Sequence, residues 1–73
     1  MSVVHVHIWK GRSIEQKRAA AKAITEAMVE HLGVHKDGLH VTFQDYELGD
    51  WARAGVLGVD RKDIPKDELE TYR

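Results

Sequence analysis

The chain has 73 residues, no cysteine and a formal net charge of −1, with acidic and basic residues interspersed. These values exclude a disulfide framework, a thiolate metal cage and a basic stripe for nucleic acid. No apolar run approaches the roughly 20 residues of a membrane span and no secretory leader is evident, so we expect one small cytoplasmic domain that binds neither membranes nor nucleic acids.

The first predicted element is a strand over residues 3–9, VVHVHIW, in which side chains alternate between two faces. Alternation with period two and β-branched residues are typical of strands. The aliphatic face, which we expect to pack on a core, comprises Val4, Val6 and Ile8. The opposite face comprises Val3, His5, His7 and Trp9.

A helix is predicted over residues 13–32. The letters SIEQ at 13–16 form a capping box, in which the Ser13 hydroxyl accepts from the Gln16 backbone N–H and the Gln16 side chain reaches back. The following residues are mostly good helix formers, and Gly33 is placed to end the helix as a C-cap. The stripe that we expect to face the core comprises Ala20, Ile24, Ala27, Met28 and Leu32.

A second strand is predicted over residues 39–46, again from alternation. Its core face comprises Leu39, Val41 and Phe43, and its opposite face comprises His40, Thr42, Gln44 and Tyr46. The helical crossover between the strands is long enough for parallel pairing, so we expect an α/β fold built on a right-handed β-α-β unit, with the helix on one sheet face. The other sheet face stays bare in one copy, and we expect symmetric contacts with further copies to cover it.

Residues 47–59 hold three glycines and predict a loop followed by a short hairpin that reaches onto a neighbouring copy. We therefore expect a single domain over residues 1–59. The polar residues 60–73 are expected to form a C-terminal extension, in which either Pro65 opens one helical turn or the segment frays.

Three histidines, His5, His7 and His40, fall on the same predicted sheet face. Such a set is able to bind zinc or nickel, but no carboxylate or cysteine joins it at an evident spacing. We favour hydrogen-bonded residues on a face between subunits over a metal site. We expect neither a metal nor another cofactor.

The letters HIWKGRS lead from the first strand into the capped helix, and the β-α-β crossover is followed by a late hairpin containing GDWARAG. This combination resembles the 4-oxalocrotonate tautomerase family over residues 2–59. The resemblance implies a hexamer built as a trimer of dimers, with active sites at subunit contacts. It also implies an amino-terminal proline, exposed by removal of the initiator methionine, whose amine moves a proton between the oxygen and carbon of an enol or dienol acid. Family arginines bind the substrate carboxylate, and an aromatic residue makes the pocket apolar.

Matched to the family's motif residue by residue, Ser2 stands at the proline position, so the amino-terminal proline is missing. Arg12 matches the arginine after the first strand and is expected to bind the substrate carboxylate; the alternative is a loop residue paired to a carboxylate of the protein. His40 replaces the arginine of the second strand, and Trp51 matches the pocket aromatic. Arg53 alters the glycine-rich stretch and is either a solvated charge or the cation that His40 no longer provides. The resemblance implies Ser2 and Arg12 as catalytic residues and Arg12, His40, Trp51 and Arg53 as substrate-binding residues.

A serine amine is able to take the role of a proline amine, because an α-amino group titrates at roughly pH 7.7–8.0, close to the pH at which a general base works best. The condition is that Met1 is removed, since an amide nitrogen at Ser2 is not basic. The leading interpretation is a tautomerase-type isomerase for a small enol, dienol or unsaturated carboxylic acid. The alternatives are a non-catalytic subunit of a mixed oligomer and a ligand- or metal-binding homo-oligomer.

Overall fold

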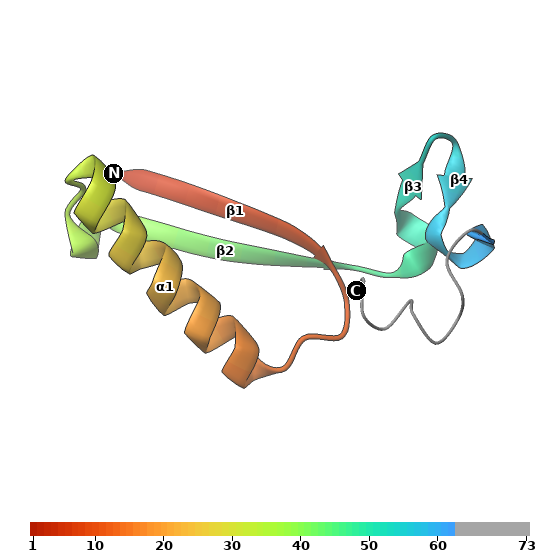
Figure 1. Ribbon diagram of the computed structural model, residues 1–73, viewed down its shortest axis with the longest axis horizontal. Helices are drawn as coiled ribbons and strands as arrows, with labels where there is room; N and C mark the ends of the chain where they lie inside the picture. Colours follow the sequence, from red (N-terminus) through yellow and green to blue (C-terminus); the bar gives the residue numbers. More distant parts are fainter. Residues whose placement is uncertain (63–73) are drawn as a thin grey trace. The chain divides into compact units, whose positions relative to one another are not determined.

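A computed structural model describes residues 1–62 of the chain, and the helical turn predicted at Pro65 lies outside them. The α-helix, strands and short 3₁₀ turns are, in chain order, β1 (Ser2–Trp9), α1 (Ile14–Leu32), η1 (Lys36–Gly38), β2 (Leu39–Tyr46), η2 (Leu48–Asp50), β3 (Ala52–Arg53), β4 (Val56–Leu57) and η3 (Gly58–Asp60) (Figure 1). The chain forms two compact units. The helical unit comprises residues 1–6 and 12–44, and the hairpin unit comprises, among the described residues, 7–11 and 45–62.

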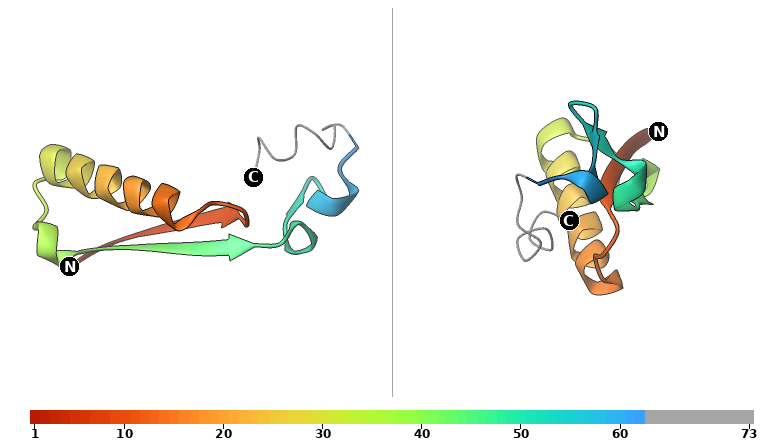
Figure 2. Two further views of the ribbon diagram at one scale, coloured as in Figure 1. Left: turned by 90° about the horizontal axis from the view of Figure 1, so that it is seen from below. Right: turned by 90° about the vertical axis from the view of Figure 1, so that its right-hand side faces the viewer.

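β1 and β2 pair in a two-stranded sheet and run in the same direction, so the predicted parallel β-α-β unit is confirmed (Figure 1). α1 connects the two strands and, within the helical unit, lies over one face of the sheet (Figure 2). The helical unit, whose residues are all described, places no element on the opposite sheet face.

The ends of α1 are fixed by the caps that the sequence predicts. The backbone N–H of Gln16 donates to the Ser13 hydroxyl at 3.1 Å, and the Ser13 N–H donates to the Gln16 side-chain oxygen at 2.8 Å. Gly33 adopts a left-handed φ of 65° and donates its N–H to the Val29 carbonyl oxygen at 3.1 Å. These caps satisfy backbone groups that a helix end leaves without intrahelical partners, which confirms the helix predicted over 13–32.

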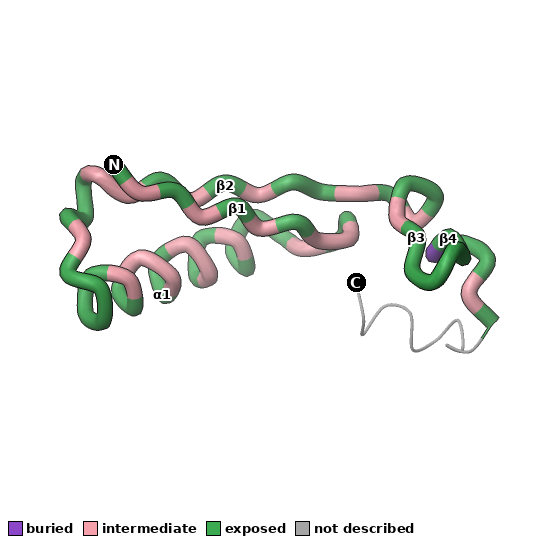
Figure 3. The backbone as a smooth tube through the Cα atoms, turned by 90° about the horizontal axis from the view of Figure 1, so that it is seen from above, coloured by how far each residue is buried: buried purple, intermediate pink, exposed green. Residues whose placement is uncertain are grey.

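Burial alternates along both strands as the sequence pattern predicts (Figure 3). The half-buried strand positions include the two predicted core faces, Val4, Val6, Ile8, Leu39, Val41 and Phe43. On α1 the half-buried apolar positions are Ala20, Ala21, Ile24 and Met28. The predicted stripe is wrong at Ala27 and Leu32, which are exposed. With about 100° of rotation per residue, Ala27 falls at the edge of the half-buried arc, and Leu32 is the last residue of the helix.

A single copy of the chain buries little. No hydrophobic side chain among residues 1–62 is fully buried, and Gly58 is the one buried residue in that range. Several apolar side chains are exposed instead, including Val3 at 49%, Leu32 at 67% and Val59 at 60%. Because apolar burial is the main favourable term in folding, one copy by itself gains little from this term.

The predicted hairpin is confirmed in the hairpin unit. β3 and β4 pair antiparallel, with Ala52 opposite Leu57 and Arg53 opposite Val56. The two-residue connection has positive φ at both positions, 53° at Ala54 and 79° at Gly55, as a type I′ turn requires. None of the helices within residues 1–62 combines the length and the apolar character that crossing a membrane requires.

Candidate active site

Ser2 and His40 lie at the same edge of the helical unit. Ser2 is the first residue of β1, and His40 is the second residue of β2. Because the strands are parallel, both residues lie where the strands begin. In a single copy Ser2 is half-buried, His40 is exposed, and the preceding Met1 is 99% exposed. The amino end of the chain is thus presented at this edge together with an imidazole.

Arg12 lies at the other end of the helical unit. It is half-buried and immediately precedes Ser13, the N-cap of α1. α1 then runs back for 19 residues, about 28 Å at roughly 1.5 Å per residue, and η1 leads into β2 at the edge where the chain begins (Figures 1 and 2). One copy therefore does not bring Ser2 and Arg12 together. A site that uses both residues needs two copies of the chain.

Trp51 lies in the hairpin unit, between η2 and β3, and is half-buried. Two aromatic rings meet it at steep angles. The Tyr46 ring centroid is 5.2 Å away with an interplanar angle of 74°, and the Trp9 centroid is 6.3 Å away at 85°. Edge-to-face pairs with centroids in this range are favourable. The predicted pocket aromatic is thus part of an aromatic cluster, which we define as Trp9, Tyr46 and Trp51.

Tyr46 and Trp9 were not among the predicted site residues. Strand alternation places both on the open sheet face, but it does not show that the loop after β2 returns Trp51 to them. The only signal for this cluster in the sequence was its composition: the chain has two tryptophans and two tyrosines. Aromatic side chains gathered near a loop would have suggested a cluster, although not its members.

Arg53 is exposed on β3, opposite Val56. It lines an open groove of about 420 Å³ in the hairpin unit. The other residues that line this groove are Ala54, Val56, Asp60, Arg61 and Lys62. Three cationic side chains therefore border one groove, with Asp60 as the acidic member.

Two histidines of β1 form hydrogen bonds with hydroxyl groups of β2. His5 Nδ1 forms a hydrogen bond with the Thr42 hydroxyl, and His7 Nδ1 forms one with the Tyr46 hydroxyl at 2.8 Å. The predicted hydrogen-bonded role of these two residues is confirmed. Within residues 1–62, no three histidine, cysteine or acidic side chains are grouped so that they could hold a metal ion.

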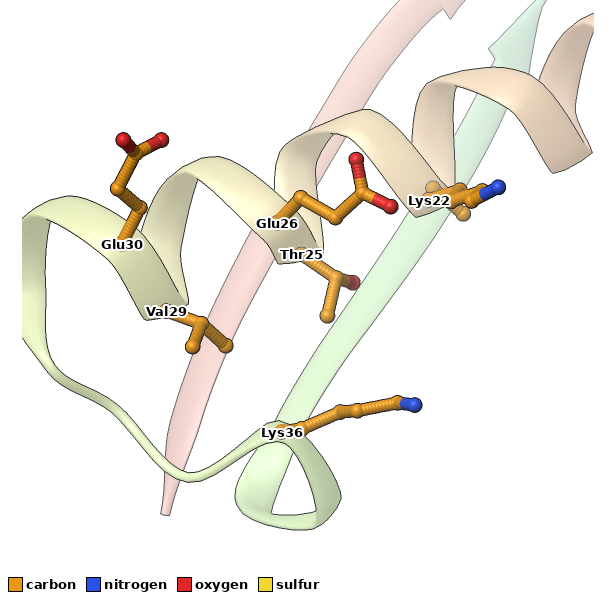
Figure 4. Close-up of a pocket in the computed structure, with 7 residues that line it drawn as sticks. Lys22, Thr25, Glu26, Val29, Glu30 and Lys36 are labelled. Carbon is orange, nitrogen blue, oxygen red and sulfur yellow. The ribbon is translucent and has the colours of Figure 1, made fainter.

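A second groove, of about 500 Å³, lies between α1 and η1 in the helical unit. Its lining consists of Ala21, Lys22, Thr25, Glu26, Val29, Glu30 and Lys36. Figure 4 shows Thr25 and Val29 on the side of the helix that faces Lys36. None of the predicted site residues lines this groove, so it is separate from the candidate active site.

Comparison with known proteins connects this geometry to one family. The model of the tautomerase enzyme family matches residues 3–61. A probable tautomerase of Lactococcus lactis subsp. lactis is 43% identical over 57 residues, which cover 78% of this chain and 93% of that protein. A 2-hydroxymuconate tautomerase of Comamonas testosteroni is 31% identical over 64 residues, which cover 88% of this chain and 97% of that protein.

Comparison with solved structures indicates the same family. A structure from a study of the 4-oxalocrotonate tautomerase isozymes of Methylibium petroleiphilum superposes with a TM-score of 0.74 at 31% identity, covering 80% of this chain and 94% of that one. The resemblance seen in the sequence and the predicted fold are both confirmed, and the match supports a tautomerase-like function. The chain belongs to the tautomerase family.

Proposed function

We propose that the chain is an isomerase of the keto–enol tautomerase type that acts on a small enol, dienol or unsaturated carboxylic acid. In this proposal each active site takes Ser2 from one copy and Arg12 from another. The observation that carries it is the placement of the two residues at opposite ends of the helical unit, with α1 between them. A homo-oligomer, with a hexamer as the expected form, would bring the two ends of different copies together.

The reaction needs a base whose neutral form is available near pH 7. After removal of Met1, the Ser2 amine accepts the proton of the enol hydroxyl and returns it to carbon. One O–H bond breaks and one C–H bond forms, the double bond shifts to give the ketone, and the amine ends as it began. An unperturbed α-amino group, with a pKa of roughly 7.7–8.0, is partly neutral at this pH.

Cationic and aromatic side chains would position the acid. The Arg12 guanidinium is suited to bidentate pairing with a carboxylate. Arg53 would supply the second cation, which the family motif has as an arginine at the position of His40, and its place in a groove with Arg61 and Lys62 supports this role. Trp51 would form the apolar wall of the site.

The test is subunit complementation with 2-hydroxymuconate, the substrate that the name of the Comamonas relative gives. One variant is Ser2→Leu, in which the large second residue keeps Met1 in place, and the other is Arg12→Ala. Ser2→Leu alone is expected to be nearly inactive, and Arg12→Ala alone to lose about 10- to 100-fold in kcat/KM. Copies that are unfolded together and refolded as a mixture should regain activity, because some sites then receive an intact amine and an intact arginine.

One outcome of the mixing experiment would contradict the shared site. If both residues act within one copy, the refolded mixture stays as inactive as its components, and the shared-site proposal is wrong. Intact-mass analysis of the unaltered chain is the required companion measurement. An unaltered chain that lacks Met1 and still converts no enol or dienol acid contradicts the proposed activity itself.

A second candidate function is a non-catalytic subunit of a mixed oligomer. It is favoured by the two departures from the family motif, Ser2 for proline and His40 for arginine. Native mass spectrometry of the purified chain separates the two candidates, because an obligate partner subunit would not form stable homo-oligomers. A cytoplasmic location and a domain boundary at residue 59 belong to the same proposal, and the lack of cysteine supports the location.

A further inference from the structure

We propose that Tyr46 is a positioning residue that holds the Trp51 indole, and that His7 holds Tyr46 in turn. The proposal deepens the function proposed above, in which Trp51 forms the apolar wall of the site. All three residues lie in the hairpin unit. Tyr46 acts through Trp51 and is not assigned a contact with the substrate.

Tyr46 is held both at its main chain and at the tip of its side chain. Its carbonyl oxygen accepts the backbone N–H of Lys10 at 2.8 Å. Its hydroxyl lies 2.8 Å from Nδ1 of His7, and the two ring centroids are 5.7 Å apart. The Lys10 ammonium also pairs at 3.0 Å with Glu47, the residue that follows Tyr46. The bond to Lys10 fixes the main chain, and the hydroxyl and ring contacts with His7 restrict the tyrosine rotamer, so the ring is a fixed support.

Trp51 rests against that support. The Tyr46 and Trp9 rings meet the indole at 74° and 85°, with centroids 5.2 and 6.3 Å away. Its carbonyl oxygen accepts the Gly58 N–H at 2.8 Å, which fixes the main chain at the same point. Rotation of the indole about its side-chain bonds would break both edge-to-face contacts, so its orientation is set before a substrate arrives. A wall set in advance adds no ordering cost on binding.

The chain offers a spectroscopic readout that is independent of activity. Trp9 and Trp51 are the only tryptophans, and two indoles held at this separation and angle give an exciton couplet in the far-ultraviolet circular dichroism. Trp51→Phe abolishes the couplet and so identifies it. In Tyr46→Leu we expect the couplet to fall to roughly half, because one of the two aromatic contacts that orient the indole is lost.

The graded variants separate ring contact from hydrogen bonding. Tyr46→Phe keeps the ring and loses the hydroxyl, so its couplet should lie between those of the unaltered chain and Tyr46→Leu. His7→Leu should match Tyr46→Phe, and the two changes together should add little to either alone, since they remove the same hydrogen bond. His7→Gln, which retains a hydrogen-bonding group, should restore most of the couplet. These milder variants decide the question if Tyr46→Leu fails to fold.

Thr42→Val is the matched control. It removes the hydroxyl of the other histidine pair, His5 with Thr42, which lies in the helical unit. The couplet should be unchanged in this variant. In the enzymatic assay Tyr46→Leu should lower kcat/KM by about threefold to tenfold, the range expected for one lost aromatic contact, whereas Thr42→Val should not.

An undiminished couplet in both Tyr46→Leu and Tyr46→Phe would overturn the proposal, as would an equal loss in Thr42→Val. A chain that shows the couplet and its dependence on Tyr46, but no turnover of enol acids, supports the positioning role and contradicts the proposed function. The two failures are therefore distinguishable.

Discussion

The backbone N–H of Gly58 donates a hydrogen bond to the carbonyl oxygen of Trp51 at 2.8 Å. This bond joins the residues that immediately precede β3 and follow β4, and so closes the open end of the hairpin. The backbone at Gly58 also lies against Leu48. A Cβ on residue 58 would lie 3.0 Å from the carbonyl oxygen of Leu48 and 3.2 Å from its Cδ2. A side chain at this position would require Leu48 to move by a few tenths of an ångström, so glycine is favoured there.

Gly58→Ala should destabilise the protein, because the new methyl group meets a main-chain oxygen that cannot move aside cheaply. We expect the free energy of unfolding to fall by about 1–3 kcal/mol, the usual cost of overpacking. Thermal melting at a fixed protein concentration checks this. Gly49→Ala is the control, since a Cβ there meets no atom within 4 Å. Equal melting temperatures for the two variants would contradict the packing at Gly58.

Ala54→Asn should stabilise the hairpin. Ala54 has φ of 53°, a conformation that costs an L-residue about 1–2 kcal/mol and that asparagine tolerates better. We expect a gain of about 0.5–1 kcal/mol in the free energy of unfolding. The same change at Ala52, which lies in β3, should give no gain because asparagine is disfavoured in strands. A loss of stability at position 54 would show that the turn is not as described.

Arg12→Ala should lower kcat/KM for an enol acid by about 10- to 100-fold, the value of a hydrogen-bonded pair between two charges. Arg12→Lys should recover only part of this loss, since an ammonium group lacks the bidentate fork. Steady-state kinetics provides the measurement. Arg18→Ala is the control, because Arg18 is 72% exposed and pairs with Glu15 one turn along α1. A similar loss in both variants would point to general charge rather than to carboxylate binding.

Ser2→Pro should raise kcat, because the proline ring restricts the amine to fewer orientations and makes it a secondary amine. We expect an increase of about tenfold, a modest share of what fixed orientation contributes to catalysis. Intact-mass analysis must show that Met1 is absent from both proteins. An unchanged or lower kcat in a chain that begins with the new proline would indicate that the amine is not the base.

The local elements were predictable from sequence because their signals are local. The capping box at Ser13, the left-handed Gly33 and the alternation of Val4, Val6 and Ile8 all depend on residues within a few positions of one another. The predicted burial of Ala27 and Leu32 was wrong, because a stripe of apolar residues does not show how wide the contact between helix and sheet is.

The candidate site was predictable only in part. Its residue types followed from the resemblance to the family, but the separation of Ser2 from Arg12 follows from the topology, in which α1 carries the chain from one end of the helical unit to the other. The contacts of Trp51 with Tyr46 and Trp9 depend on the path of the loop after β2. The alternation of side chains along a strand does not predict that path.

In the homo-oligomer proposed above, the lack of a buried hydrophobic side chain among residues 1–62 of one copy would also set how the protein responds to dilution. When apolar surface is covered mainly by other copies, dissociation and unfolding become one equilibrium, and its midpoint moves with total concentration. The amount of chain that a cell makes then acts as a threshold. Below this threshold concentration, copies would dissociate, unfold and be open to proteolysis.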